Sequence, residues 1–157
     1  MRAADLVVLY DYYYWATKKI LAQATKLDAE QWAGTPTLSD RSVQTILVHT
    51  LSAERDWRSG WEGKERQARL QDADFSDATA LAARWAVEER AMRAYLSSLD
   101  DETLAGPFYD LTLWHVIAHL AHHGMQHRSE AAMLLTGYGY SPGEIDMVFW
   151  LDERAAG

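Results

Sequence analysis

The sequence contains no cysteine, and this absence removes several kinds of chemistry at once. Without thiols the chain cannot form a disulfide framework, supply a thiolate nucleophile or build a zinc site that includes cysteine. No apolar run approaches the roughly 20 residues that a membrane-spanning helix needs. The first residues lead directly into an amphipathic pattern and show no signal-peptide cleavage pattern. From these absences we expect a cytoplasmic protein.

Positive charge is also scarce. The chain carries 15 Lys and Arg against 23 Asp and Glu, which gives a formal net charge of −8. A negative field repels the phosphate backbone of nucleic acids and the headgroups of anionic lipids. We therefore expect neither nucleic acid nor a membrane surface as a partner.

Glycine and proline, at 9 and 3 residues, separate long segments that are rich in good helix formers. The pattern predicts four long helices and one shorter C-terminal helix, over residues 3–26, 42–59, 77–98, 111–136 and 142–154. Ser141, Pro142 and Glu144 have the spacing of a capping box with proline at the first helical position. We expect a single all-α domain over residues 1–157: an up-and-down four-helix bundle with an additional short C-terminal helix.

Five of the six histidines lie in the fourth long segment, and the sixth, His49, lies in the second. Histidines four residues apart share a helix face, and several pairs here have that spacing. At about 100° per residue, His127 projects about 20° and His123 about 60° from the centre of the apolar face. His49 projects about 60° from the apolar centre of its own helix. The remaining ones project roughly 100° or more away: His115, His119 and His122.

Three imidazoles are thus expected to face one core. A buried histidine must be neutral and hydrogen-bonded, or it must bind a metal. Any one of them alone is readily explained as a hydrogen-bonded core residue, but three together favour a metal. We predict one divalent transition-metal ion per chain, bound by His49, His123 and His127, with Zn²⁺ first and Ni²⁺, Co²⁺ or Fe²⁺ as alternatives. Three protein ligands leave a position open for water or substrate.

Residues near these histidines permit two interpretations each. Asp56, seven residues after His49, either orients a ligand imidazole through its free N–H or lies in solvent. Glu54 projects about 80° from the centre of its helix face, which indicates no definite role. Arg128 is expected to pair with an acid at a helix boundary or a dimer surface. An aromatic group in the first helix is expected mainly to pack between helices: Tyr10, Tyr12, Tyr13, Tyr14 and Trp15.

Two segments resemble a known family. The fourth helix, LWHVIAHLAHHGMQHRSEAAMLL, is similar to the signature helix of DinB-like (YfiT-like) proteins, in which two histidines four residues apart precede a His-Arg pair. The second, ILVHTLSAERDW, resembles the family's other element, with a histidine, a Glu five residues on and a Trp eight residues on. Asp11 and Glu130 depart from the family pattern, which has an amide-type residue and more commonly Gln at these positions.

The resemblance implies a four-helix bundle, commonly dimeric, whose metal ligands fall on His49, His123 and His127. It also implies a metal-dependent enzyme that transfers a low-molecular-weight thiol (mycothiol, bacillithiol or glutathione) to a small electrophile. A metal-dependent hydrolase of a small ester or amide, and a non-enzymatic stress protein that binds a metal or small ligand, remain open. The pattern assigns no catalytic residue. We expect a homodimer, because the last helix offers more apolar residues than one small face needs.

Overall fold

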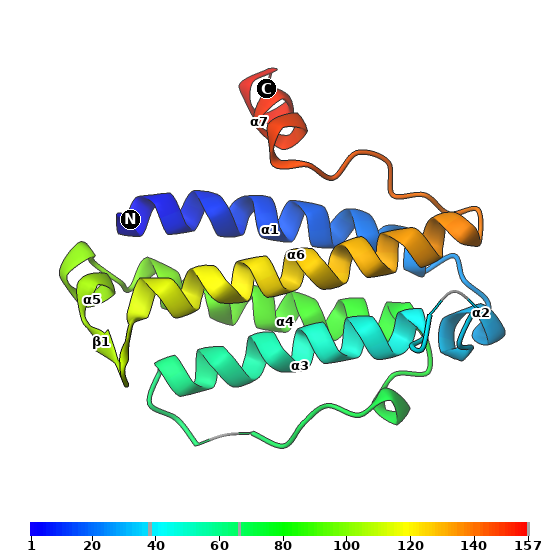
Figure 1. The fold of residues 1–157 in the computed structure, drawn as a ribbon, viewed down its shortest axis with the longest axis horizontal. Helices are drawn as coiled ribbons and strands as arrows, with labels where there is room; N and C mark the ends of the chain where they lie inside the picture. Colours follow the sequence, from blue (N-terminus) through cyan, green and yellow to red (C-terminus); the bar gives the residue numbers. More distant parts are fainter. Residues whose placement is uncertain (38, 66, 157) are drawn as a thin grey trace.

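The computed structural model describes residues 1–37, 39–65 and 67–156. Four long helices lie side by side (Figure 1): α1 (Ala3–Ala24), α3 (Val43–Trp61), α4 (Ala78–Ser97) and α6 (Leu113–Gly137). Shorter elements connect or follow them: α2 (Ala29–Ala33), the 3-10 turn η1 (Asp72–Asp74), α5 (Asp101–Ala105), the antiparallel strands β1 (Pro107–Phe108) and β2 (Leu111–Thr112), and α7 (Met147–Ala156). The expected all-α bundle with a short C-terminal helix is confirmed.

The core lies between the four long helices. Helix α1 packs against α4 and α6, and α3 packs against the same two helices. Their inward faces are apolar and fully buried, for example at Ile20, Leu47 and Leu81. Short polar side chains begin two of the helices: Ser42 accepts a hydrogen bond from the N–H of Thr45, and the cap of α4 is Asp77. This core holds the histidine-bearing helices α3 and α6 face to face.

The helix directions differ from the simple up-and-down order that we expected. Glu54 contacts Trp85 and, four residues on, Arg58 contacts Glu88, so residue numbers rise together along α3 and α4. These two helices are therefore parallel, whereas α1 and α6 run the opposite way (Figure 1). A parallel pair requires a connection that spans the bundle, and the polar segment between α3 and α4 supplies it.

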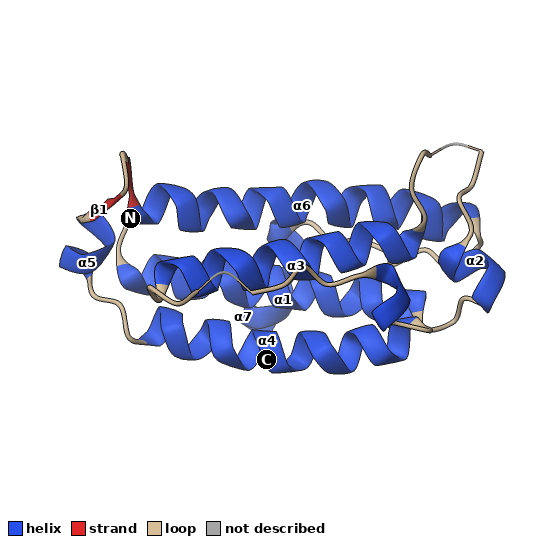
Figure 2. Ribbon diagram, turned by 90° about the horizontal axis from the view of Figure 1, so that it is seen from below, coloured by secondary structure: helices blue, strands red, loops and turns tan. Residues whose placement is uncertain are grey.

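That connection, residues 62–65 and 67–77 as described, is here called the crossover segment. It runs back along α3 from its end to its start, as Figures 1 and 2 both show. The N–H of Leu70 donates to Oγ of Ser52 at 3.2 Å, and the hydroxyl of Thr45 donates to Asp72 at 2.6 Å. The segment therefore covers one flank of α3 and places Arg69 level with the first half of that helix.

The C-terminal helix begins later than expected. It spans Met147–Ala156 rather than 142–154, and the predicted capping box at its start does not form. Gly143 has φ +69, a left-handed conformation that ends any helix starting at residue 142. The N–H of Gly143 donates to Oγ of Ser141 at 3.2 Å, so the Ser141 hydroxyl stabilises a turn and does not cap a helix.

Helix α7 packs on the outer side of α1 (Figure 1). The Tyr12 hydroxyl donates to the carbonyl oxygen of Ile145 at 2.9 Å, and the indole of Trp15 donates to Glu153 at 2.9 Å. The ring of Trp150 is buried beside Tyr12. Three large apolar side chains of this helix are exposed: Val148, Phe149 and Leu151. The homodimer expected through this helix stays a prediction.

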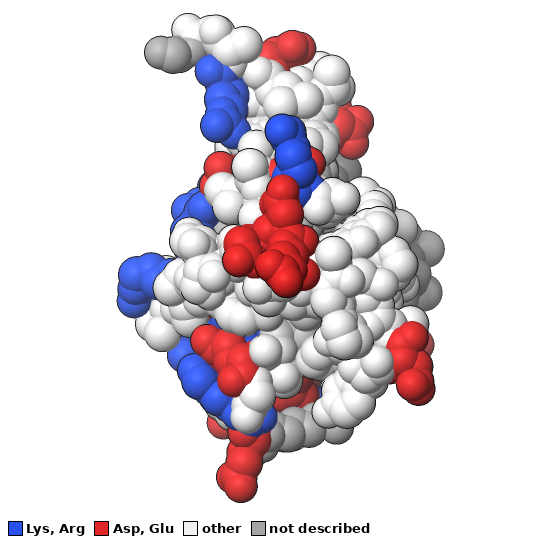
Figure 3. Space-filling view, turned by 90° about the vertical axis from the view of Figure 1, so that its left-hand side faces the viewer, with Lys and Arg blue, Asp and Glu red and all other residues white. Residues whose placement is uncertain are grey.

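Acidic side chains mark one end of the molecule. Figure 3 views the end that holds the N-terminus and α5, where a group of Asp and Glu lies in the middle and Lys and Arg lie above it and to its left. Helix α5 contributes the exposed carboxylates of Asp101 and Glu102.

Among the residues that the structure describes, no helix is long and apolar enough to cross a membrane.

Candidate metal centre

Three histidines from two helices meet between α3 and α6. Ring nitrogens of His49, His123 and His127 lie within 4.8 Å of one another. The Nε2 atoms of His123 and His127 are 3.2 Å apart, and the ring centroid of His49 lies 4.8 Å from that of His127. These are the three residues that the sequence predicts as ligands, and the fold brings all of them together.

A carboxylate fixes the orientation of one imidazole. Nδ1 of His127 lies 2.9 Å from Oε2 of Glu130, one helical turn on, so Nδ1–H donates to the carboxylate and Nε2 keeps its lone pair. Arg41 donates in turn to the same Oε2 at 2.6 Å. Burial acts to raise the pKa of Glu130, but the hydrogen bond from His127 and the charge of Arg41 leave it lowered. The hydrogen bonds from His127 and Arg41 to Glu130 thus direct the free Nε2 of His127 towards the other two imidazoles.

The environment keeps the other two imidazoles neutral. Burial lowers the pKa of His123 to about 4, and the neighbouring His127 and His49 act in the same direction. Burial also lowers the pKa of His49, as do His127 and the guanidinium of Arg69. Neutral imidazole is the form that binds a metal ion.

The donor set fits a divalent ion. Nδ1 of His123 is buried and has no hydrogen-bond partner among the residues that the structure describes, while its Nε2 faces a ring nitrogen of His127. Three imidazoles without a thiolate are a usual set for Zn²⁺ and for neighbouring first-row ions. The cluster can therefore hold a metal ion, and the donor set does not identify which one.

The other histidines of α6 lie outside the cluster, as expected. His119 is exposed, with its ring 6.0 Å from that of Trp57. His115 is exposed beside Trp114, and His122 is exposed on the helix surface. The carboxylate that contacts a clustered imidazole is Glu130 rather than Asp56, whose spacing from His49 suggested that role.

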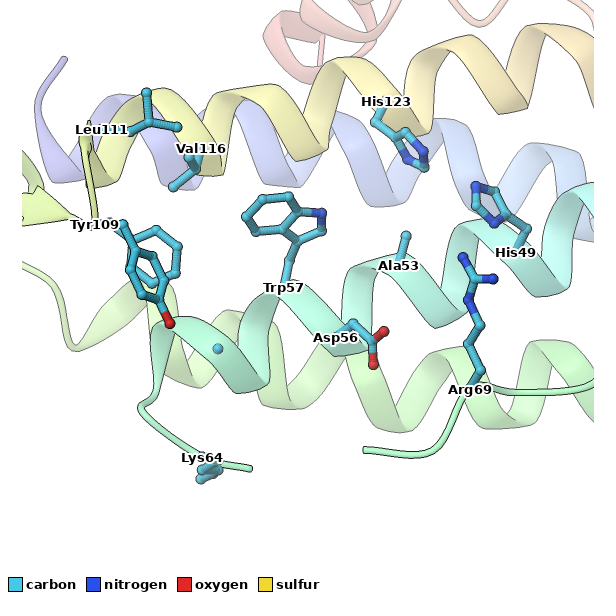
Figure 4. A pocket seen from close by; sticks show the side chains of 12 residues that line it. His49, Ala53, Asp56, Trp57, Lys64, Arg69, Tyr109, Leu111, Val116 and His123 are labelled. Carbon is cyan, nitrogen blue, oxygen red and sulfur yellow. The ribbon is translucent and has the colours of Figure 1, made fainter. Parts of the chain in front are cut away.

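A pocket of about 640 Å³ opens directly on the cluster. His49 and His123 form its inner end, Trp57 and Val116 line its middle, and the hairpin of β1 and β2 forms its outer end (Figure 4). The remaining lining residues come from α3, the hairpin and the crossover segment: Ala53, Asp56, Gly60, Lys64, Arg69, Phe108, Tyr109 and Leu111. A small molecule in this pocket reaches the histidines without any movement of the helices.

Comparison with known proteins agrees with this geometry. The model of the DinB family matches residues 1–155 of the chain. The chain belongs to the DinB family. No curated protein matches the sequence. Family membership and the three-histidine cluster together fit a metal-binding protein of the DinB family.

This DinB-family protein also has a buried carboxylate that sequence reasoning missed. Glu54 is fully buried and accepts hydrogen bonds from the hydroxyls of Tyr13 and Tyr14 and from the indole of Trp85, at 3.1 Å for Tyr13 and 2.9 Å for Trp85. Burial raises the pKa of Glu54 to about 7, against the opposing effect of these hydrogen bonds. Its partners come from α1 and α4, so the projection of α3 alone gave no signal for it.

Arg128 was expected to pair with an acid, but its guanidinium is buried over the ring of Tyr13, 4.3 Å from the centroid, and one nitrogen donates to Thr17 at 3.5 Å. The tyrosines of α1 do pack between helices, and they use their hydroxyls internally. The hydroxyl of Tyr10, for example, donates to the carbonyl oxygen of Ile117 at 3.0 Å.

Proposed function

We propose that this DinB-family protein is a metal-dependent enzyme that transfers a low-molecular-weight thiol to a small electrophile. The observation that carries the proposal is the pocket whose inner end is formed by His49 and His123, two members of the three-histidine cluster. A buried structural metal site would be closed off by protein ligands, whereas this cluster borders a cavity of about 640 Å³.

Each part of the site has a role in this proposal. His49, His123 and His127 would hold the ion, and Glu130 keeps the His127 ring in the tautomer that binds it. A bound divalent ion supplies Lewis acidity, which lowers the pKa of a coordinated thiol or water and so provides a nucleophile near neutral pH. The pocket walls orient the second substrate and exclude water from the reacting atoms.

The proposed reaction balances without a redox partner. The thiolate sulfur forms a bond with the electrophilic carbon, and the leaving group departs with the electrons of the bond that breaks. The proton of the thiol passes to solvent. No buried general base is needed, because the ionised thiol is already the nucleophile.

The test is a transfer assay with purified protein. Glutathione, bacillithiol and mycothiol are each offered with 1-chloro-2,4-dinitrobenzene, and the thioether product is followed by its absorbance. We expect turnover with at least one thiol, its loss on chelation and its return when a divalent ion is added. His127→Ala should abolish turnover, whereas the exposed His122→Ala should retain it. Turnover that survives both chelation and His127→Ala would refute the proposal.

A second candidate, a hydrolase of a small ester or amide, is favoured by one observation. Asp56 lines the same pocket and is the carboxylate that this candidate would use to activate a water. Ester hydrolysis that depends on the metal and falls strongly in Asp56→Asn would support this candidate over thiol transfer. A protein that binds the metal and catalyses neither reaction would be the non-enzymatic binding protein.

A further inference from the structure

Among the described residues, the pocket beside the histidine cluster contains one cation, Arg69, that has no acidic partner. Arg69 lines the pocket from the crossover segment, and Figure 4 shows its guanidinium extended towards His49. Lys64, the other pocket cation, is paired with Glu62 at 2.9 Å, and Arg41 behind the cluster is paired with Glu130. In the part of the chain that the structure describes, no carboxylate forms an ion pair with Arg69.

Arg69 is exposed, so water screens its charge, but an anion bound beside it is still attracted to it. A guanidinium beside His49 repels the divalent ion that the cluster is proposed to hold, and it raises the cost of bringing a cation there. An anionic group between Arg69 and the cluster is attracted both to the guanidinium and to a bound ion. Arginine is also suited to this role, because its planar fork of donors matches the two oxygens of a carboxylate.

The rest of the pocket is mainly apolar. Trp57, Phe108 and Val116 line its length, and the hairpin adds Tyr109 and Leu111 at the outer end, with 89% and 56% of their surfaces exposed. Tyr109 also has φ +52, which is uncommon for a residue other than glycine. Such a backbone conformation holds a large apolar ring at the pocket mouth instead of folding it into the core.

Asp56, the acidic residue among the described lining residues, does not occupy the same place as Arg69. Asp56 extends from α3 between Trp57 and Arg69, whereas the guanidinium of Arg69 lies next to His49 (Figure 4). Asp56 also has an interaction of its own. The inner end of the pocket is therefore cationic, and its outer end is mainly apolar, with Lys64 paired to Glu62.

We propose that Arg69 binds the carboxylate of an amphipathic substrate whose apolar part extends along Trp57 towards the hairpin. The assignment of this carboxylate to a substrate rests on the proposed thiol transfer, in which either the thiol or the electrophile carries it. Binding of the carboxylate itself is independent of that reaction.

A matched pair of ligands tests the binding. The dissociation constants of 3-phenylpropionate and 3-phenylpropanamide are measured by calorimetry with the protein as purified and again with chelator present. The two ligands share a shape and differ in charge. We expect the carboxylate to bind about fivefold more tightly than the amide with chelator present, as one solvent-accessible ion pair allows. A preference for the carboxylate that disappears with the metal would mean that the ion, not Arg69, binds it, and would overturn the proposal.

Two variants isolate the arginine. Arg69→Gln should remove the preference for the carboxylate and leave the affinity for the amide unchanged. Arg90→Gln, which removes an exposed arginine of α4 outside the pocket, should keep the preference. Equal affinities for the two ligands in the wild type, no binding of either, or equal effects of the two variants would overturn the proposal.

Transfer assays then identify which substrate carries the carboxylate. N-acetylcysteine and N-acetylcysteamine differ only by a carboxylate on the thiol, and 4-chloro-3-nitrobenzoate and its amide differ at that group on the electrophile. Arg69→Gln should raise KM severalfold for one of the two carboxylated compounds. The KM for its uncharged analogue should not change. Binding that depends on Arg69 without any transfer would refute the proposed function alone, and transfer that is indifferent to Arg69 would refute this inference alone.

Discussion

Gly124 lies so close to Tyr13 that a β-carbon on Gly124 would be 2.8 Å from the phenol oxygen and 2.9 Å from Cζ. The absence of a side chain next to His123 thus lets the tyrosine cross from α1 to reach Glu54 on α3. The same ring lies under the guanidinium of Arg128. One glycine therefore links the packing of three helices to the turn that carries a clustered histidine.

We expect Gly124→Ala to lower the free energy of unfolding by about 2 kcal/mol, because the added methyl group must displace a buried ring and overpacking of this kind costs roughly 1–3 kcal/mol. Urea denaturation followed by circular dichroism measures the change. Gly137→Ala is the control on the same helix, since nothing lies within 4 Å of its β-carbon. An unchanged midpoint in Gly124→Ala would contradict the close approach.

The second prediction concerns pH. Burial raises the pKa of Glu54 from 4.5 to about 7, so between these values the folded protein holds a proton that the unfolded chain has lost. The contribution of Glu54 to stability is therefore complete below pH 4.5 and is lost as the pH rises through 7. Over that window the loss is on the order of 3 kcal/mol.

Glu54→Gln removes this titration. Between pH 4.5 and pH 8, the unfolding free energy of the wild type should fall relative to that of Glu54→Gln by on the order of 3 kcal/mol. Histidine titration is common to both proteins and cancels in the difference. The exposed Glu102→Gln should show no such shift relative to the wild type. Parallel pH profiles for the wild type and Glu54→Gln would show that this carboxyl titrates normally.

The carboxylate behind the cluster should matter to metal affinity. Glu130→Gln weakens the acceptor that holds Nδ1–H of His127, and loss of such partners typically costs 10–100-fold in affinity. Competition with a chelator of known affinity gives the dissociation constant. Gln126→Ala is the control, because Gln126 donates to Glu130 at 3.4 Å and, among the described residues, forms no hydrogen bond with an imidazole. Equal dissociation constants for Glu130→Gln and the wild type would remove Glu130 from the metal centre.

Metal removal should affect function more than folding. The cluster joins α3 and α6 at one place, while the buried core extends over all four long helices. We expect chelation to leave the helical circular-dichroism signal nearly intact and to lower the melting temperature, since a ligand that binds only the folded state stabilises it. Collapse of the helical signal on chelation would instead make the ion a structural one.

The sequence was sufficient for the elements that depend on local pattern. Helix periodicity places His49, His123 and His127 on inward faces, and the structure brings them together. The same periodicity fails for Glu54, because a helical projection shows one face at a time and the partners of Glu54 come from two other helices. Arg128 is a second case: the projection of α6 alone does not show that its guanidinium packs over the ring of Tyr13 on α1.

Chain direction and the C-terminal boundary depended on features that pattern does not encode. The length and polarity of the crossover segment fit either a wide loop or a connection that spans the bundle. Its hydrogen bonds to α3 hold it in the spanning arrangement. The Ser-Pro-Gly-Glu sequence at residues 141–144 satisfies the helix-start rule locally. The left-handed conformation of Gly143 and the bond from Tyr12 to Ile145 override that rule.

The most direct test of the central claim is the metal content of three purified proteins. Elemental analysis should find about one divalent transition-metal ion per chain in the wild type. We expect near-complete loss in His127→Ala and full retention in His119→Ala, because His119 is exposed and lies outside the cluster of ring nitrogens. Full occupancy in His127→Ala, or equal loss in both variants, would contradict a metal centre built from His49, His123 and His127.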